Sequence, residues 1–201
     1  WKWFVLSVLA ALAIAYVKLR YSVPEYAAEA KIQILDDKNS TSELSTFQDL
    51  GIVPGGANKV EDEIQIINSR SNFIEVVKKL GLNVKITSLG KILDSEIYQN
   101  PPFKVNFIAK DSIVNNAKFA FFITLSNATT FGYTEQEDMP LKAYAYGKNI
   151  NTPIGDIVIT PNVADITGYA DKKYMVSVTP VVMVAQQYQK KVIVSPASEY
   201  S

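Results

Sequence analysis

Residues 3–17 read Trp3-Phe4-Val5-Leu6-Ser7-Val8-Leu9-Ala10-Ala11-Leu12-Ala13-Ile14-Ala15-Tyr16-Val17, and no charged side chain interrupts this apolar segment. As an α-helix the segment would be about 22 Å long, which is shorter than the ~30 Å hydrocarbon core of a bilayer. Residues upstream of Trp1 would supply the missing length. The sequence therefore predicts a transmembrane helix over residues 1–20, whose anchoring side chains are Trp3, Phe4, Leu6, Leu9, Leu12, Ile14 and Val17.

Two other interpretations fit the same segment. A cleaved signal peptide would use Lys2 as its charge and Ala13-Ile14-Ala15 as its cleavage site, whereas a buried core helix would need only the apolar run. Aromatic and basic residues just beyond the run, such as Tyr21 and Arg20, favour the anchor because they suit the headgroup region. The anchor and the signal peptide both send the following residues out of the cytosol.

Composition limits the chemistry that this chain of 201 residues can perform. Its 20 basic and 20 acidic residues balance, so no basic footprint for nucleic acid is present. The absence of Cys and His removes disulfides, the commonest zinc sites and the Ser–His–Asp triad. No phosphate-binding P-loop occurs either. We expect no catalytic residue, no cofactor and no metal, and read Asp36-Asp37 and Glu61-Asp62-Glu63 as structural acidic clusters rather than general acids or a calcium site.

The first half of the remaining chain predicts one strand, a long loop and two helices. Residues 26–35 alternate between apolar and polar side chains, which is typical of a half-buried strand. Residues 36–59 are polar and Gly-rich, and predict a loop. Residues 60–80 have helical periodicity in two pieces, with Asn72 and Glu75 as a capping box for the second piece and Gly81 as its end.

The second half predicts mainly strands. A short strand at 83–87 is followed by helical spacing at 89–97, and then by strand patterns at 103–107, 119–125, 141–146, 156–160 and 173–179. Thr179-Pro180 predicts the start of another helix, and residues 191–195 predict a return to strand. The fold class expected is α+β: an N-terminal transmembrane helix, then one mixed α+β domain over residues 21–201 with a β-rich second half. Because the chain starts at Trp1 and ends without a clear stop, we expect it to be truncated.

The order of several motifs resembles that of the polysaccharide co-polymerases, the chain-length determinant (Wzz) family. After the apolar segment come Tyr26-Ala27-Ala28-Glu29-Ala30-Lys31-Ile32-Gln33-Ile34, Glu63-Ile64-Gln65-Ile66-Ile67-Asn68-Ser69-Arg70-Ser71 and Val76-Val77-Lys78-Lys79-Leu80-Gly81-Leu82. The later stretch Glu96-Ile97-Tyr98-Gln99-Asn100-Pro101-Pro102-Phe103-Lys104-Val105, and the run around Thr152-Pro153-Ile154-Gly155, look like the Wzc-type subgroup. None of these motifs is catalytic.

The resemblance implies a scaffold of the bacterial inner membrane whose residues after about 20 lie in the periplasm. Such proteins form homo-oligomeric rings and act with the polysaccharide polymerase or export machinery, and with the nascent polysaccharide. They control the chain length or export of capsule, exopolysaccharide or O-antigen. In the Wzc-like branch a cytoplasmic tyrosine kinase follows a second span. That span, the extended helices and the kinase domain are not in this sequence, and Lys18 and Arg20 depart from the positive-inside tendency.

Glu63 and Arg70 are the candidates for a subunit interface. Arg70 shares the predicted helix face of Ile64 and Ile67, where an exposed charge is out of place. A carboxylate such as Glu63 of a neighbouring copy could pair with this guanidinium.

Two other functions compete with the scaffold. One is a membrane-tethered or secreted carbohydrate-binding module, in which the β-rich half forms a jelly-roll. The other is an enzyme that works through two carboxylates facing each other across a cleft. Aromatic residues of the β-rich half could stack on sugar rings, but their alternation predicts core packing.

Overall fold

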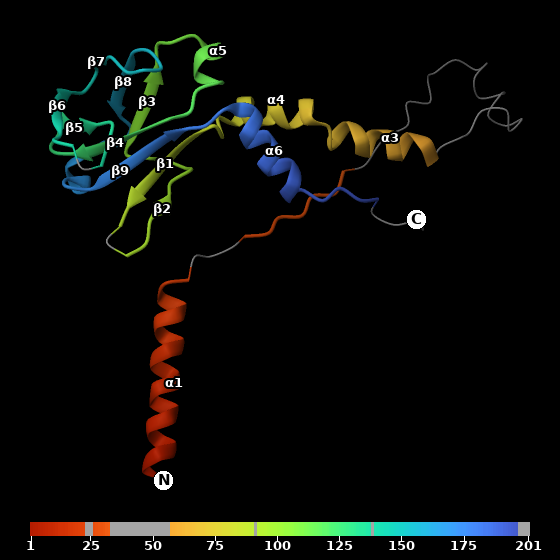
Figure 1. The fold of residues 1–201 in the computed structure, drawn as a ribbon, viewed down its shortest axis with the longest axis vertical. Helices are drawn as coiled ribbons and strands as arrows, with labels where there is room; N and C mark the ends of the chain where they lie inside the picture. The colour runs from red at the N-terminus through yellow and green to blue at the C-terminus, as the bar shows by residue number, and fades with distance from the viewer. Residues whose placement is uncertain (23–25, 33–56, 91, 138, 197–201) are drawn as a thin grey trace, which may run out of the picture. The chain divides into compact units, whose positions relative to one another are not determined.

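The computed structural model describes residues 1–22, 26–32, 57–90, 92–137 and 139–196. The chain divides into two units, Trp1–Leu35 and Asp36–Ser201. The predicted α+β class is confirmed, because one apolar N-terminal helix precedes a unit that mixes helices and strands (Figure 1).

The first unit contains helix α1, Lys2–Arg20, and the described residues 26–32 have no regular structure. No side chain of α1 is buried. The strand predicted over residues 26–35 does not form at 26–32, where every side chain is exposed, and residues 33–35 lie outside the described residues. Alternating side chains define the faces of a strand, but a strand also needs a neighbour to accept its backbone hydrogen bonds.

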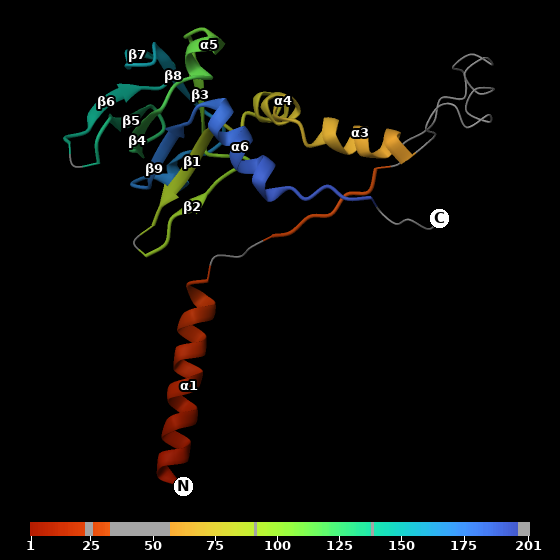
Figure 2. The same ribbon diagram turned by 45° about the vertical axis from the view of Figure 1, so that its right-hand side comes forward.

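The second unit is built on two antiparallel sheets (Figures 1 and 2). The larger sheet has the order β2-β1-β9-β4-β5-β6, and the smaller has the order β3-β8-β7. The strands of the larger sheet are β1 (Val84–Leu89), β2 (Ser95–Glu96), β4 (Phe119–Leu125), β5 (Thr130–Thr134), β6 (Lys142–Ala145) and β9 (Lys173–Val178). Those of the smaller sheet are β3 (Phe103–Phe107), β7 (Asn149–Ile150) and β8 (Ile157–Pro161).

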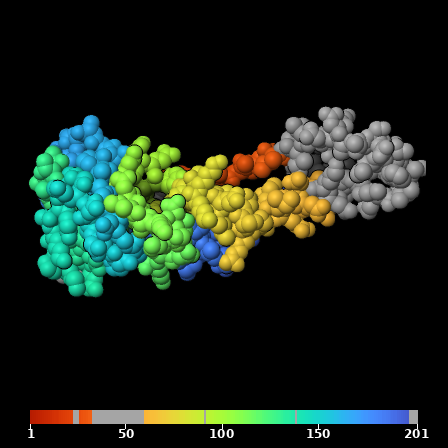
Figure 3. Space-filling view, turned by 90° about the horizontal axis from the view of Figure 1, so that it is seen from above, coloured from red at the N-terminus to blue at the C-terminus, as the bar shows by residue number. Residues whose placement is uncertain are grey.

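The two sheets share one hydrophobic core. Phe121 and Ile123 of β4 and Tyr174 of β9 pack in the same buried cluster as Phe103 of β3 and Ile159 of β8. The Phe103 and Tyr174 rings meet edge-on, with centroids 5.4 Å apart. In the space-filling view the residues of the sheets, coloured green to blue, form one continuous mass (Figure 3). The prediction that the alternating aromatic residues pack in a core is confirmed.

Among the described residues of this unit, three longer helices and two short ones accompany the sheets. Helix α3 (Ala57–Ile67) precedes α4 (Arg70–Leu80), and α4 packs on α6 (Val181–Lys191) through a separate cluster of buried residues. That cluster contains the predicted stripe of α6: Val181, Val184, Ala185 and Tyr188. Helix α5 (Asp111–Val114) and the 3₁₀ turn η1 (Thr167–Tyr169) are short.

Several element predictions were wrong. The helical spacing at 89–97 instead belongs to the β1–β2 hairpin, in which Thr87 pairs with Glu96. Strand β5 was missed. Residues 192–196 form no strand, and α6 continues to Lys191. The cap of α6 is Pro180, without a side-chain hydrogen bond, rather than Thr179.

Candidate functional site

Helix α1 presents an apolar surface on every side. An 18-residue window of this 19-residue helix has a mean hydropathy of 1.8, and no residue of that window is buried in the described structure. The predicted anchor residues Trp3, Leu9 and Ile14 expose 85 %, 59 % and 69 % of their surface. The hydrocarbon core of a bilayer would satisfy such a surface, because the helix keeps its backbone hydrogen bonds internal. By length and composition, α1 is able to cross a membrane.

A corner held by hydrogen bonds joins α3 to α4. Helix α3 ends at Ile67, and the Ser69 hydroxyl accepts a hydrogen bond from the Asn72 backbone N–H at 3.3 Å, which makes Ser69 the N-cap of α4. The Asn72 side chain reaches back and donates to the Ile67 carbonyl at 2.8 Å. The Gln189 side chain of α6 donates to the Asn68 carbonyl at 2.7 Å. These three bonds satisfy backbone groups that a broken helix would otherwise leave without partners.

The cap therefore lies three residues before the predicted one. Asn72 with Glu75 was expected to start the second helix, but Asn72 already lies in the first turn of α4. The predicted end is confirmed: Gly81 has a left-handed φ of 64°, and the Leu82 N–H donates to the Val77 carbonyl at 3.1 Å.

The corner separates Glu63 from Arg70. Glu63 is exposed on α3, and Arg70 is exposed as the first residue of α4. Arg70 thus does not continue the α3 face of Ile64 and Ile67, as the sequence predicted, because the helix stops at Ile67. Glu61 and Asp62 also lie beyond the first turn of α3, which begins at Ala57, so the helix dipole is not the reason for the acidic cluster.

A shallow hollow lies at the corner. It is lined by Asp62, Gln65, Ile66, Ser69 and Ser71. Ile66 exposes 60 % of its surface there, and the four other side chains are polar. One exposed aliphatic side chain among polar neighbours is ordinary on a protein surface and does not by itself mark a binding site.

In the sandwich that the two sheets form, burial and hydrogen bonds shift the pKa values of several groups. Burial raises the pKa of the Tyr133 phenol, and the Glu135 carboxylate adds to the rise. Burial also raises the pKa of Tyr174, with a smaller contribution from Tyr169. The Thr167 hydroxyl and backbone N–H both donate to the Asp165 carboxylate and lower its pKa, which is the pattern of a turn that caps itself.

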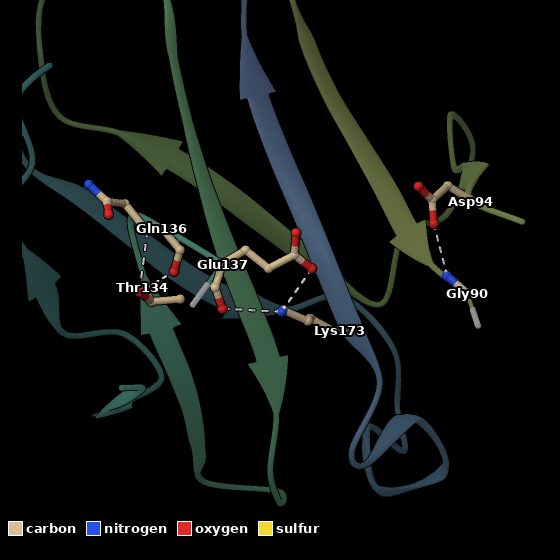
Figure 4. Close-up of polar contacts among 6 residues, drawn as sticks. All are labelled: Gly90, Asp94, Thr134, Gln136, Glu137 and Lys173. Carbon is tan, nitrogen blue, oxygen red and sulfur yellow. Dashed lines mark hydrogen bonds and ion pairs between the residues drawn. The ribbon is translucent and has the colours of Figure 1, made fainter. Parts of the chain in front are cut away.

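Polar contacts at one end of the larger sheet hold the ends of strands and turns in place (Figure 4). The Lys173 ammonium pairs with the Glu137 carboxylate at 3.1 Å, and the Thr134 hydroxyl donates to the Gln136 carbonyl at 2.8 Å. The Gly90 N–H donates to the Asp94 carboxylate at 3.1 Å. Within the part of the chain that the structure describes, no group of three or more acidic residues could hold a metal ion.

Comparison with known proteins agrees with the N-terminal motifs. Residues 1–80 match the family model of Wzz, the chain length determinant protein. This match supports the predicted polysaccharide co-polymerase family and a chain-length determinant role in polysaccharide polymerisation at a membrane. No curated protein matches the chain.

Proposed function

We propose that this chain is the anchor and periplasmic scaffold of a polysaccharide co-polymerase. In this proposal α1 holds the chain in the bacterial inner membrane, and the second unit lies in the periplasm as part of a homo-oligomer. The assembly acts with the polymerase or export machinery and sets the chain length of a capsular, exopolysaccharide or O-antigen polymer. The observation that supports this proposal most directly is the family match over residues 1–80, which spans α1, α3 and α4.

The proposal gives this chain no chemical step. Tyr133 and Tyr174 have pKa values raised by burial, so these phenols stay protonated and are poor bases. The Asp165 carboxylate is engaged by Thr167. A purified sample should therefore hydrolyse neither ATP nor glycans, and a turnover abolished by one Asp or Glu substitution would contradict this.

The Wzc-like resemblance adds a further proposal, a cytoplasmic tyrosine kinase in the full-length protein, which the downstream gene sequence tests.

Aromatic packing argues against the carbohydrate-binding module. The rings of Phe103, Phe121, Phe131, Tyr133 and Tyr174 are all at most 4 % exposed. Sugar rings stack on exposed aromatic faces, and these rings are used in the core. Among the described residues of the sandwich, Tyr98 is the aromatic side chain that is mainly exposed, at 60 %.

Deletion of the gene tests the function. The source bacterium without the gene should make polymer with a shifted length distribution on a gel, and a plasmid copy should restore the original distribution. An unchanged distribution in the deletion strain would contradict the proposed role.

Arg70 and Glu63 remain the proposed charged pair of the subunit interface. Both are exposed and lie on either side of the corner, so each is accessible to a neighbouring copy. Arg70→Glu should remove the high-order species of the full-length protein in detergent without changing its melting temperature. Lys104→Glu is the matched control, because Lys104 is exposed on β3. Unchanged oligomer size together with normal polymer length would make Arg70 an ordinary surface residue.

A further inference from the structure

The chain enters and leaves the sandwich at one point. Strand β1, which follows α4, is the direct neighbour of β9, which precedes α6. Val84, the first residue of β1, pairs with Val178, the last residue of β9. The Thr179 N–H donates to the Asn83 carbonyl at 2.9 Å and closes this point. Residues 83–179 therefore begin and end side by side, which is typical of a domain inserted into another domain.

The sandwich and the α4–α6 helix pair have separate buried cores. The described residues of two buried clusters, which include Phe121 and Val178, all lie within residues 83–179. The described residues of the third cluster, with Val77 on α4 and Val184 on α6, all lie outside that range. Burial of apolar side chains is the main stabilising contribution to folding, so each part has its own source of stability.

Helices α4 and α6 are also held together outside the sandwich. Gly81, in the left-handed conformation, ends α4 before β1 begins. At the far end of the pair, the Gln189 side chain of α6 donates to the Asn68 carbonyl at 2.7 Å. Both ribbon views show the two helices side by side next to the sheets (Figures 1 and 2). The Val181 N–H, which donates to the Asn115 carbonyl at 2.8 Å, fixes the start of α6 to the sandwich at the junction.

The residues on which the proposed homo-oligomer rests lie before the sandwich. The family match covers residues 1–80 and stops at Leu80, the last residue of α4. Glu63 and Arg70, the charged pair proposed for the subunit interface, lie within the same range. The proposed assembly is thus linked to the anchor and the helices, and not to the strands.

We propose that residues 83–179 are an autonomous domain inserted between α4 and α6, and that the copies assemble through the rest of the chain without it. The inference rests on the proposed homo-oligomer and assigns it to one part of the chain. It divides the single mixed domain that the sequence predicts for residues 21–201. A length of roughly 100 residues is ordinary for a domain that folds alone.

Deletion of the sandwich tests where assembly resides. Val84 and Val178 face each other in an antiparallel pair, so Asn-Gly in place of residues 85–177 joins them by a two-residue hairpin turn. The full-length protein with this deletion should enter the membrane and form an oligomer with the unchanged number of copies, measured by light scattering in detergent. Arg70→Glu, added to the deletion variant as a control, should remove that oligomer.

Hydrogen exchange of the undeleted protein tests the independence of the two cores. Ile123→Ala opens a cavity in the sandwich, and Val77→Ala opens one between α4 and α6, because both side chains are fully buried. Each variant should speed amide exchange about tenfold or more in its own part and less than about twofold in the other, since each part opens as its own cooperative unit. Lys104→Ala, at an exposed position of β3, is the control and should change neither part.

The outcomes separate this inference from the scaffold function. Equal acceleration of exchange in both parts by either variant would show one cooperative unit and overturn the autonomous domain. A deletion variant that keeps α4 and α6 protected but loses the oligomer would place assembly in the sandwich, and one that loses this protection would show that the helices need the sandwich. Either result overturns the inference and leaves the scaffold function intact. Absence of any oligomer in the unsubstituted full-length protein would overturn both.

Discussion

Replacement of Ser69 measures how much the corner depends on one hydroxyl group. The Ser69 side chain accepts from the Asn72 N–H at 3.3 Å and is the only side-chain cap seen at the start of α4 among the described residues. Ser69→Ala should cost about 1 kcal/mol of the free energy of unfolding. Because α4 packs on α6 through buried Phe73 and Val77, loss of the cap is felt by the whole unit. For a unit of this size, about 1 kcal/mol lowers the melting temperature by roughly 3 °C.

The chemistry of capping predicts a graded series at this position. Ser69→Asp should keep the wild-type melting temperature, since a carboxylate accepts the same bond and suits the positive end of the helix. Ser69→Gly should cost only a few tenths of a kcal/mol. Ser71→Ala is the control, because the Ser71 hydroxyl contacts Ser69 at 3.1 Å but caps no backbone group. The assay is thermal unfolding of the full chain in detergent, followed by circular dichroism. If Ser69→Asp is as unstable as Ser69→Ala, or if Ser69→Ala is silent, the assignment of the cap to Ser69 is refuted.

Two further predictions concern the sandwich. Gly155→Ala should lower the free energy of unfolding by roughly 3 kcal/mol, because Gly155 has a φ of 102° and an added Cβ would lie 2.7 Å from the Ala109 Cβ. Gly147→Ala, at a φ of 78° with open space around it, should lower it by roughly 1 kcal/mol in the same unfolding assay. Equal losses in the two variants would contradict the steric argument. The raised pKa of Tyr133 means that the folded protein keeps this proton to higher pH than the unfolded chain, so its contribution to stability is complete below about pH 10 and declines above it. Tyr133→Phe should flatten the alkaline fall of the melting temperature, and an unchanged slope would show that Tyr133 does not govern it.

Strand predictions succeeded where one face of the strand meets a core. Phe103, Val105 and Phe107 alternate with exposed Lys104 and Asn106, and β3 forms at those residues. Strand β5 was missed because its sequence, Thr-Phe-Gly-Tyr-Thr, follows a polar turn and contains Gly132. That glycine lies close to Leu141, since a Cβ there would lie 3.2 Å from the Leu141 side chain. This close approach joins Gly132, in the middle of β5, to Leu141, just before β6. A pattern in the local sequence does not contain such a contact between two strands.

At two places the sequence carries a helix signal, but the structure adopts a different arrangement there. Residues Leu89 to Ile97 keep helical spacing, yet the Ile97 N–H donates to the Ile86 carbonyl at 2.8 Å in the hairpin. Pairing with β1, which β9 holds in the sheet, gives these residues tertiary support, and a short isolated helix is only marginally stable in water. At the corner, Asn72 and Ser69 are both good caps by residue type. The structure uses Ser69, and the Asn72 side chain instead donates to the Ile67 carbonyl.

Exposed apolar residues show the sharpest limit of sequence reasoning. Ile66 lies in a predicted amphipathic helix and Ile92 in a predicted helical stripe, so both read as ordinary core positions. Periodicity reports that a face is apolar, but not whether the chain itself supplies the surface that covers it. In this fold α6 covers α4, whereas Ile66 on α3 and Ile92 at the turn remain mainly exposed. Single apolar residues on a protein surface are common and do not by themselves indicate a partner. Which apolar residues of a predicted helix face lie in the core therefore became visible only after the core of the unit had been assigned.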